Sequence, residues 1–141
     1  MTNTIHVDIV SAEREIYSGE AEMVFAPAEM GEVGIAPNHA PLVTRMRPGE
    51  VRVRDTEGNE SAFYVSGGLL EVQPKVVTVL SDTAQRAEDL DEAAILKAKE
   101  DAEHAFQEKD AQIDYARAKA ALVETAAQLQ AIQRLRKRAG R

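Results

Sequence analysis

The chain has 141 residues, of which 44% are hydrophobic and 29% charged, a size and composition that fit one globular domain, alone or with an appendage. It has no cysteine, so disulfides and thiolate sites are excluded, and its net charge of -7 argues against nucleic acid as the main partner, because phosphate binding needs a basic face. The first residues have no basic start and no apolar run of signal length, and no window is long enough to span a membrane, so we expect a soluble protein.

In the first half of the chain, apolar residues alternate with polar ones at the spacing of β-strands. Alternation with one polar face predicts antiparallel sheet. The alternating apolar positions are Ile5, Val7 and Ile9, then Ala21, Met23 and Phe25, then Val51 and Val53.

Turn residues divide this half at short intervals. Residues 55–59 (Asp-Thr-Glu-Gly-Asn) predict a hairpin whose return strand is 62–65, and residues 73–75 predict a turn between strands at 67–72 and 76–80. Turns at intervals of about 8–12 residues, with no helix between them, indicate a sandwich or flattened barrel.

Residues 31–43 concentrate glycine and proline more than any other stretch. The glycines permit positive φ and the prolines fix φ, so we predict a tight, stiff turn that leaves Glu32 and His39 facing outward. Such a turn can present side chains to a partner. An ordinary structural turn between two strands accounts for the same local chemistry.

The composition changes after residue 75, because every proline and seven of the eight glycines precede it. The remainder is rich in Ala, Glu, Lys, Gln and Leu and predicts two helices. Asp89 is the predicted N-cap of the first helix, with Glu92 completing a capping box, and Asp110 is the predicted cap of the second. The predicted apolar faces are Ala94, Ile95, Ala98, Ala102, Ala105 and Phe106, and then Ile113, Tyr115, Ala118, Leu122, Ala126, Leu129 and Ile132.

The sequence therefore predicts an α+β protein in which an antiparallel β-sandwich, residues 1–87, is followed by an antiparallel two-helix hairpin, residues 88–141. Alanine at most facing positions of the hairpin buries little area, at about 25 cal/mol per Å². We expect the hairpin to dock weakly on the sandwich and to be able to leave it.

Basic residues cluster at the end of the second helix, at Arg134, Arg136, Lys137, Arg138 and Arg141. Positive charge stabilises a helix C-terminus, but five charges in eight positions exceed what the dipole needs. We expect this basic tip to meet an acidic surface on a partner protein.

Catalytic and metal-binding patterns are missing from the sequence. Its three histidines, His6, His39 and His104, have no paired spacing, and with no cysteine the sequence lacks the ligand pattern of a zinc site. Nucleophile elbows, phosphate-binding loops and dinucleotide fingerprints are missing too. We expect no catalytic, metal or cofactor site.

Three signatures, in this order and followed by an alanine-rich helical hairpin, resemble the epsilon subunits of bacterial proton-translocating ATP synthases over essentially the whole chain. They are residues 31–42, residues 66–72 (Ser-Gly-Gly-Leu-Leu-Glu-Val), and residues 79–84 leading into 86–91.

The resemblance implies a non-catalytic subunit of a rotary enzyme, peripheral to the cytoplasmic face of the bacterial inner membrane. Its sandwich would bind the gamma subunit and stand on the ring of c subunits, with Glu32 and His39 touching the polar loops of that ring. Its helices would either fold against the sandwich or extend along gamma into the catalytic head of alpha and beta subunits and inhibit ATP hydrolysis. The tip, Arg134, Arg136, Lys137 and Arg138, would then face an acidic stretch of a beta subunit.

Some members of this family bind ATP on the folded hairpin through an Ile/Leu-Asp-x-x-Arg-Ala motif. Leu90 and Asp91 retain its start, but Ala94 stands at the arginine position. Glu124 and Gln128 stand where further phosphate-binding arginines would align. Because these charge-assisted contacts are lost, we expect weak or absent ATP binding.

A second hypothesis from the residues is a free-standing interaction module that binds some other acidic protein. Co-purification with gamma and the head subunits separates the two hypotheses.

Overall fold

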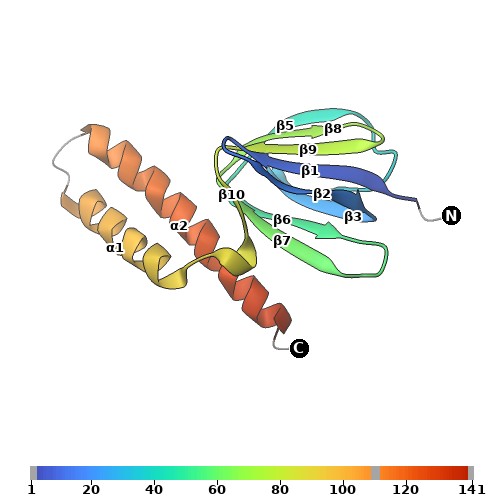
Figure 1. Cartoon of the computed structure of the whole chain (residues 1–141). Helices are drawn as coiled ribbons and strands as arrows, with labels where there is room; N and C mark the ends of the chain where they lie inside the picture. Colours follow the sequence, from blue (N-terminus) through green and yellow to red (C-terminus); the bar gives the residue numbers. More distant parts are fainter. Residues whose placement is uncertain (1–2, 109–111, 140–141) are drawn as a thin grey trace. The chain divides into compact units, whose positions relative to one another are not determined.

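The computed structural model describes residues 3–108 and 112–139, with side chains described for 3–104 and 117–138. The chain divides into two compact units, residues 1–87 and 88–141. Figure 1 shows strands in the first unit and helices in the second.

The first unit is a two-layered arrangement of short strands, which confirms the predicted sandwich (Figure 1). The strand order is β10-β7-β6-β3-β5-β8-β9-β1-β2, and β4 is an extra strand that pairs with β3. Within the described residues the strands are β1 (Ile5–Ser11), β2 (Glu15–Ala21), β3 (Met23–Ala28), β4 (Gly31–Ile35), β5 (Leu42–Met46), β6 (Gly49–Arg54), β7 (Glu60–Val65), β8 (Gly68–Val72), β9 (Val76–Ser81) and β10 (Ala84–Arg86).

One strand pair departs from the antiparallel expectation. β1 runs parallel to β9, with His6 opposite Val76 and Ser11 opposite Ser81. The other strand pairs of the described residues are antiparallel. A parallel pair needs a long crossover, and here the whole of β2 to β8 provides it.

The core is built from alternate strand residues. Ile5, Val7 and Ile9 of β1 are fully buried, as predicted, and Val51 and Val53 of β6 face the same core. The Tyr17 and Phe63 rings pack with their centroids 5.2 Å apart. Most inward positions of the sandwich are therefore apolar, with Ser11, Glu50 and Ser81 as buried polar exceptions, and the intervening residues form the outer surface.

The predicted alternation of Ala21, Met23 and Phe25 is wrong. The chain changes strands at Glu22, whose backbone N–H donates to the Arg54 carbonyl oxygen at 2.8 Å. Beyond this break Val24 and Ala26 point into the core, and Met23 and Phe25 are half-buried on the other side. Because the predicted alternation ran across a strand boundary, it assigned the side chains of β3 to the wrong faces of the sheet.

Residues 31–43 are not a single turn. Gly31–Ile35 form β4 and Leu42–Met46 form β5, so only residues 36–41 make the connecting loop. The predicted hairpin at 55–59 is confirmed, with Gly58 at a φ of 86°. The predicted turn at 73–75 is confirmed by a hydrogen bond from the Gln73 N–H to the Val76 carbonyl at 2.8 Å.

Gly68 explains one of the sequence signatures. Its φ is 120°, and a Cβ at this position would overlap the carbonyl oxygen of Leu80 and lie 2.9 Å from the Cα of Ser81. No other residue type fits where β8 approaches β9 so closely. The second glycine of the Ser66-Gly67-Gly68 run is therefore a packing requirement of the sandwich.

The short helix η1 (Ala87–Asp89) spans the boundary between the units, and the second unit contains α1 (Glu92–Glu108) and α2 (Gln112–Ala139). The predicted two-helix hairpin is confirmed, since α1 and α2 pack against each other in opposite directions (Figure 1). Neither helix, over the described residues, combines the length and apolar character that crossing a membrane requires.

The predicted capping box is wrong by two residues. Asp89 lies in η1, and Asp91 is the N-cap of α1 because its Oδ1 accepts the N–H groups of Ala93 at 3.1 Å and Ala94 at 3.3 Å. Asp91 is the residue directly before the first turn, where an oxygen can reach these unpaired N–H groups.

The predicted apolar faces of the helices are partly wrong. Ile95, Ala102, Ala118 and Ile132 are buried as predicted, but Ala94, Ala98 and Ala126 are exposed. Thr125 is buried instead, and its hydroxyl donates to the Ala121 carbonyl at 2.9 Å, so it carries no unpaired donor. Ala105, Phe106, Ile113, Tyr115 and the cap Asp110 lie outside the described side chains.

Candidate functional site

Glu32 is the second residue of β4, and its side chain is 48% exposed. Its Oε1 accepts a hydrogen bond from Arg52 Nη2 at 2.6 Å. Arg52 comes from β6, so the bond reaches across β3, which lies between the two strands. The structure thus places Glu32 on the surface and restrains it by a charged partner.

Arg52 makes two further contacts. Its guanidinium carbon lies 4.4 Å from the centre of the Phe25 ring, and its Nη1 lies 3.6 Å from Glu60 Oε1. The arginine side chain is 23% exposed, so most of it is covered by neighbouring groups. Stacking on an aromatic face together with an ion pair fixes the plane of a guanidinium.

His39 lies in the loop between β4 and β5, four residues after β4 ends. The preceding residue, Asn38, has a φ of 65°, a left-handed conformation that Asn tolerates better than most residues. The Asn38 N–H donates to the Pro74 carbonyl oxygen at 2.9 Å, which ties this loop to the turn between β8 and β9.

The His39 ring is oriented by its own backbone. Nδ1 lies 2.7 Å from the Ala40 carbonyl oxygen, and because a carbonyl only accepts, Nδ1 is the protonated nitrogen. Nε2 is then the nitrogen left to meet another group. Among the described residues Glu32 and His39 share no hydrogen bond or ion pair, so they are two separate contact points rather than one polar pair on a single turn.

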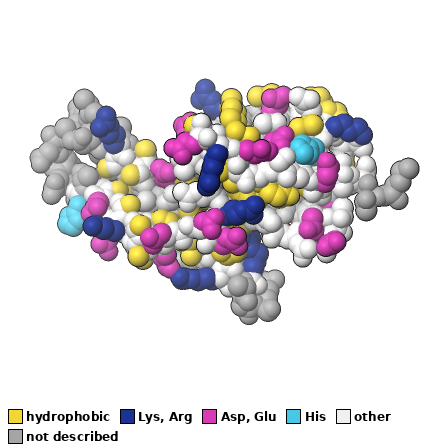
Figure 2. Space-filling view, viewed as in Figure 1, with side chains coloured by type: hydrophobic (Ala, Val, Ile, Leu, Met, Phe, Trp, Pro, Cys, Tyr) yellow, Lys and Arg dark blue, Asp and Glu magenta, His cyan; other side chains and the backbone are white. Residues whose placement is uncertain are grey.

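Three exposed apolar side chains lie on neighbouring strands of the sandwich. Val43 of β5 is 69% exposed, Leu69 of β8 is 46% exposed and Leu80 of β9 is 48% exposed. Leu69 pairs directly with Leu80 on one side and with Arg45 on the other. Figure 2, viewed as Figure 1, shows hydrophobic atoms at the surface along the side of the sandwich where β5 and β8 run. We call Val43, Leu69 and Leu80 the outer apolar face.

A polar network on β1 and β2 was not predicted. His6 lies between the inward residues Ile5 and Val7, and its side chain, which is 36% exposed, bridges two carboxylates. Its Nδ1 lies 3.2 Å from Glu20 Oε1 and its Nε2 lies 3.0 Å from Asp8 Oδ1. Ser18 donates to the same Asp8 oxygen at 2.8 Å.

The network changes the protonation of His6. The hydrogen bond to Glu20 contributes most to raising the pKa of His6 above its usual value of 6.5; partial desolvation opposes the rise, and the interactions with Asp8 add to it. The sequence contains one indication of this network, because His6 with Asp8 and Ser18 with Glu20 are polar residues two positions apart. It does not reveal that the two strands that carry them pair with each other.

The basic tip occupies the last turns of α2. Arg134, Arg136 and Lys137 are exposed and Arg138 is half-buried, while Arg141 lies outside the described residues. Arg136 forms a bidentate ion pair with Glu92 in the first turn of α1, with Nη1 3.3 Å from Oε1 and Nη2 in contact with Oε2. One of the tip residues is thus engaged within the hairpin itself.

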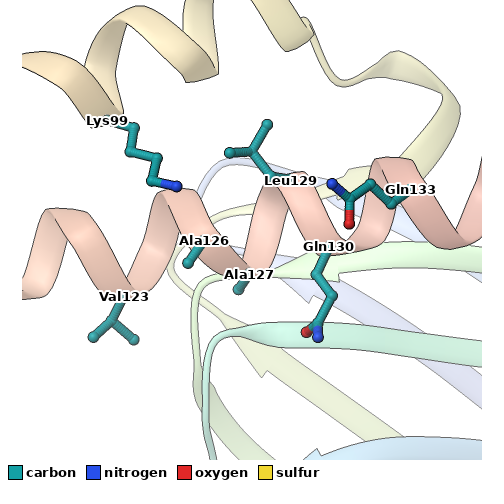
Figure 3. Close-up of a pocket in the computed structure, with 7 residues that line it drawn as sticks. All are labelled: Lys99, Val123, Ala126, Ala127, Leu129, Gln130 and Gln133. Atoms are coloured by element: carbon teal, nitrogen blue, oxygen red, sulfur yellow. The ribbon is translucent and has the colours of Figure 1, made fainter.

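The start of the nucleotide motif has structural roles. Leu90 is half-buried, and the Asp91 carboxylate caps α1 as described above. The hairpin has an open depression of about 540 Å³, drawn in Figure 3. It is lined by Lys99, Val123, Ala126, Ala127, Leu129, Gln130 and Gln133. Lys99 is the one cationic residue among the described residues that line it, which is little for a polyphosphate.

Comparison with known proteins gives consistent matches over both units. The family described as "ATP synthase, Delta/Epsilon chain, beta-sandwich domain" matches residues 4–87, and "ATP synthase, Delta/Epsilon chain, long alpha-helix domain" matches residues 88–133. The chain is 67% identical to the ATP synthase epsilon chain of Nitrosococcus oceani, over 99% of this chain and 100% of the relative. It is 60% identical to that of Alkalilimnicola ehrlichii, over 99% of each chain.

Solved structures share the fold. A chain in the cryo-EM structure of the Euglena gracilis mitochondrial ATP synthase, OSCP/F1/c-ring in rotational state 1, aligns with a TM-score of 0.84 at 21% identity, covering 92% of this chain and 82% of that one. A chain of the Tetrahymena thermophila mitochondrial ATP synthase central stalk and c-ring aligns with a TM-score of 0.65 at 14% identity, covering 91% and 96%.

Proposed function

This chain belongs to the family of ATP synthase epsilon chains, and from that membership we propose that it is a non-catalytic central-stalk subunit that couples rotation to ATP synthesis and restrains ATP hydrolysis. The observation that carries the proposal is that the match to curated epsilon chains extends over 99% of this chain, so it includes the sandwich and the helical hairpin together.

The outer apolar face is the surface we assign to the gamma subunit. Leu69 and Leu80 are cross-strand neighbours, and Val43 is on the next strand, so the three lie on one side of the sandwich. About half or more of each residue is exposed there. Adjacent exposed apolar side chains mark protein contacts, and the centres of interfaces are depleted of charge. A subunit that must turn with the stalk needs this kind of attachment.

Glu32 and His39 are the residues we assign to the ring of c subunits. Both are on parts of the sandwich that strand pairing and hydrogen bonds hold in place, β4 by β3 and the following loop by Pro74. A carboxylate and an imidazole with one free nitrogen suit polar loops with donor groups. Held by such contacts, the chain is peripheral to the cytoplasmic face of the membrane through the complex.

The helical hairpin is the unit we assign to the restraint of hydrolysis. Among the side chains that the structure describes in the hairpin, the largest buried ones are Ile95 and Ile132, and the other buried ones are Ala102, Ala118, Thr125 and Ala131. Small side chains bury little apolar area, so this described part of the contact between the helices is weak for its length. The basic tip, Arg134, Arg136, Lys137 and Arg138, is the part that would contact acidic groups on the beta and alpha subunits of the head.

ATP binding to the hairpin is weak or absent in this proposal. The Asp91 carboxylate is used as a helix cap, and Glu92, which follows it, pairs with Arg136. Isothermal titration calorimetry of the full chain with ATP tests this, and a micromolar dissociation constant would overturn it.

The test of the proposed function is ATP hydrolysis by the membrane-bound complex, with the full chain or with a chain that ends after Glu88. We expect the shortened chain to stay bound and coupled while hydrolysis rises, because the sandwich retains its contacts and the helices are gone. Unchanged hydrolysis with the shortened chain still bound would remove the restraining role. Failure of the full chain to remain with gamma and the head subunits through detergent and salt would contradict the central-stalk assignment and favour a free-standing interaction module.

A further inference from the structure

We propose that Arg52 is the positioning residue of the Glu32 contact, holding that carboxylate in the orientation in which it meets a cationic or hydrogen-bond-donating partner. The inference rests on the proposed function, because it takes Glu32 to be a contact with the c-subunit ring. What it adds is a residue on another strand through which the contact is prepared.

The strand register brings the two residues together. Phe25 of β3 lies opposite Gly34 of β4 on one side and opposite Arg52 of β6 on the other. Side chains on one face of neighbouring strands stand side by side, so Arg52 faces the Phe25 ring and, beyond it, β4. The observed cation–π distance of 4.4 Å agrees with this placement.

Gly34 provides the room for this reach. A Cβ at Gly34 would lie 2.9 Å from the Met23 methyl carbon and 3.5 Å from a Phe25 ring carbon. With no side chain at position 34, the Phe25 ring occupies the space beside β4, and Arg52 extends over that ring to Glu32. This gives the second glycine of the Gly31-Glu32-Val33-Gly34 signature a role apart from turning the chain.

Arg52 leaves half of the Glu32 carboxylate available. The hydrogen bond uses Oε1, and among the described residues no hydrogen bond or ion pair holds Oε2. A carboxylate accepts about four hydrogen bonds, so Oε2 can receive a donor from a partner while Oε1 stays bound. The side chain then loses little rotamer freedom on binding, because Arg52 has already ordered it.

Arg54 provides a matched control in the same strand and on the same face. Its guanidinium carbon lies 5.3 Å from the Phe25 ring centre, and its Nη2 lies 3.6 Å from Glu60 Oε2, much as Arg52 contacts Phe25 and Glu60. Among the described residues Arg54 makes no contact with Glu32. The two arginines therefore differ in the one contact on which the inference depends.

The experiment measures binding of the full chain to the isolated c-subunit ring in detergent for wild type, Arg52→Gln, Arg54→Gln, Glu32→Gln and the Glu32→Gln/Arg52→Gln double variant. We expect Arg52→Gln to weaken binding by about two- to tenfold, the usual effect of ordering one side chain. We expect Arg54→Gln to bind as wild type does, and Arg52→Gln to have no further effect when Glu32 is already glutamine. The last result distinguishes positioning through Glu32 from a general structural effect.

Each failure points to a different cause. If Glu32→Gln binds the ring as wild type does, the ring contact itself is wrong. If Glu32→Gln weakens binding but Arg52→Gln does not, or if the two losses simply add in the double variant, the positioning role is refuted. Should Arg52→Gln fail to fold, Arg52→Lys replaces it. Lysine keeps the charge but lacks the planar guanidinium that contacts Glu32 and Glu60 together. If the Arg52→Lys variant binds the ring as wild type does, the inference is overturned.

Discussion

Substituting Gly68 by alanine should strongly destabilise the sandwich. The new Cβ would overlap the Leu80 carbonyl oxygen and approach the Ser81 Cα to 2.9 Å, and both are backbone atoms of the neighbouring strand. A non-glycine residue in a sparsely populated conformation such as φ 120° costs about 1–3 kcal/mol by itself. Relieving the overlap requires β8 to move away from β9, which disturbs pairs such as Leu69 with Leu80. We therefore expect a loss above about 3 kcal/mol, a large part of the 5–15 kcal/mol typical of a domain.

Gly58→Ala is the matched control for this prediction. Gly58 also has a positive φ, 86°, but a Cβ there would have no atom within 4 Å. Only conformational strain applies, at about 1–2 kcal/mol. The assay is amide hydrogen exchange, measured on peptides from β7 to β9 while the full chain is unfolded in urea. Because these peptides come from the sandwich, the measured unfolding is that of the sandwich and not of the helices. Equal shifts for the two variants would refute the argument from close strand approach.

Two further predictions concern His6 and Asp91. His6→Asn should lower stability most below the unfolded-state pKa of about 6.5, and this loss should shrink as pH rises through the raised folded-state pKa. The reason is that a raised folded-state pKa gives stability that is complete below the unfolded value and is lost as pH passes the folded value. Urea unfolding at two pH values tests this, and an equal loss at both would contradict it. Asp91→Ala should cost about 0.5–2 kcal/mol in hydrogen-exchange protection of the first turns of α1. Asp89→Ala is its control, and an equal cost there would contradict the cap assignment.

The sequence predicted the sandwich where alternation lies within one strand. β1 and β6 follow the inward positions Ile5, Val7 and Ile9, and Val51 and Val53. β2 and β5 were missed because residue type does not follow burial along them. In β5 the apolar Val43 is exposed while the polar Thr44 is half-buried, and in β2 an inward position is occupied by Gly19. β4 was not predicted because its two glycines indicate a turn as long as its pairing with β3 is unknown.

The candidate site was predictable one residue at a time but not as a set of contacts. Glu32 and His39 were named by resemblance, and the structure places both in positions from which they can meet a partner. Arg52 alternates with the inward residues Val51 and Val53, but its bond to Glu32 also requires that β3 lie between β4 and β6. Lateral order and register depend on the whole sheet, so no local pattern contains them.

An exposed ion pair and small buried side chains hold the hairpin together only weakly, and its proposed role requires a hairpin that can open. The Arg136–Glu92 pair is 66% and 36% exposed, and exposed ion pairs contribute about 0–1 kcal/mol after solvent screening. Breaking this pair to let Arg136 meet a carboxylate on the head therefore costs little. A hairpin with a strong ion pair and a core of large side chains would remain closed whatever partner was offered. Among its described side chains, the buried residues of the hairpin are small apart from Ile95 and Ile132, which leaves an opening cost that contacts with a partner can offset.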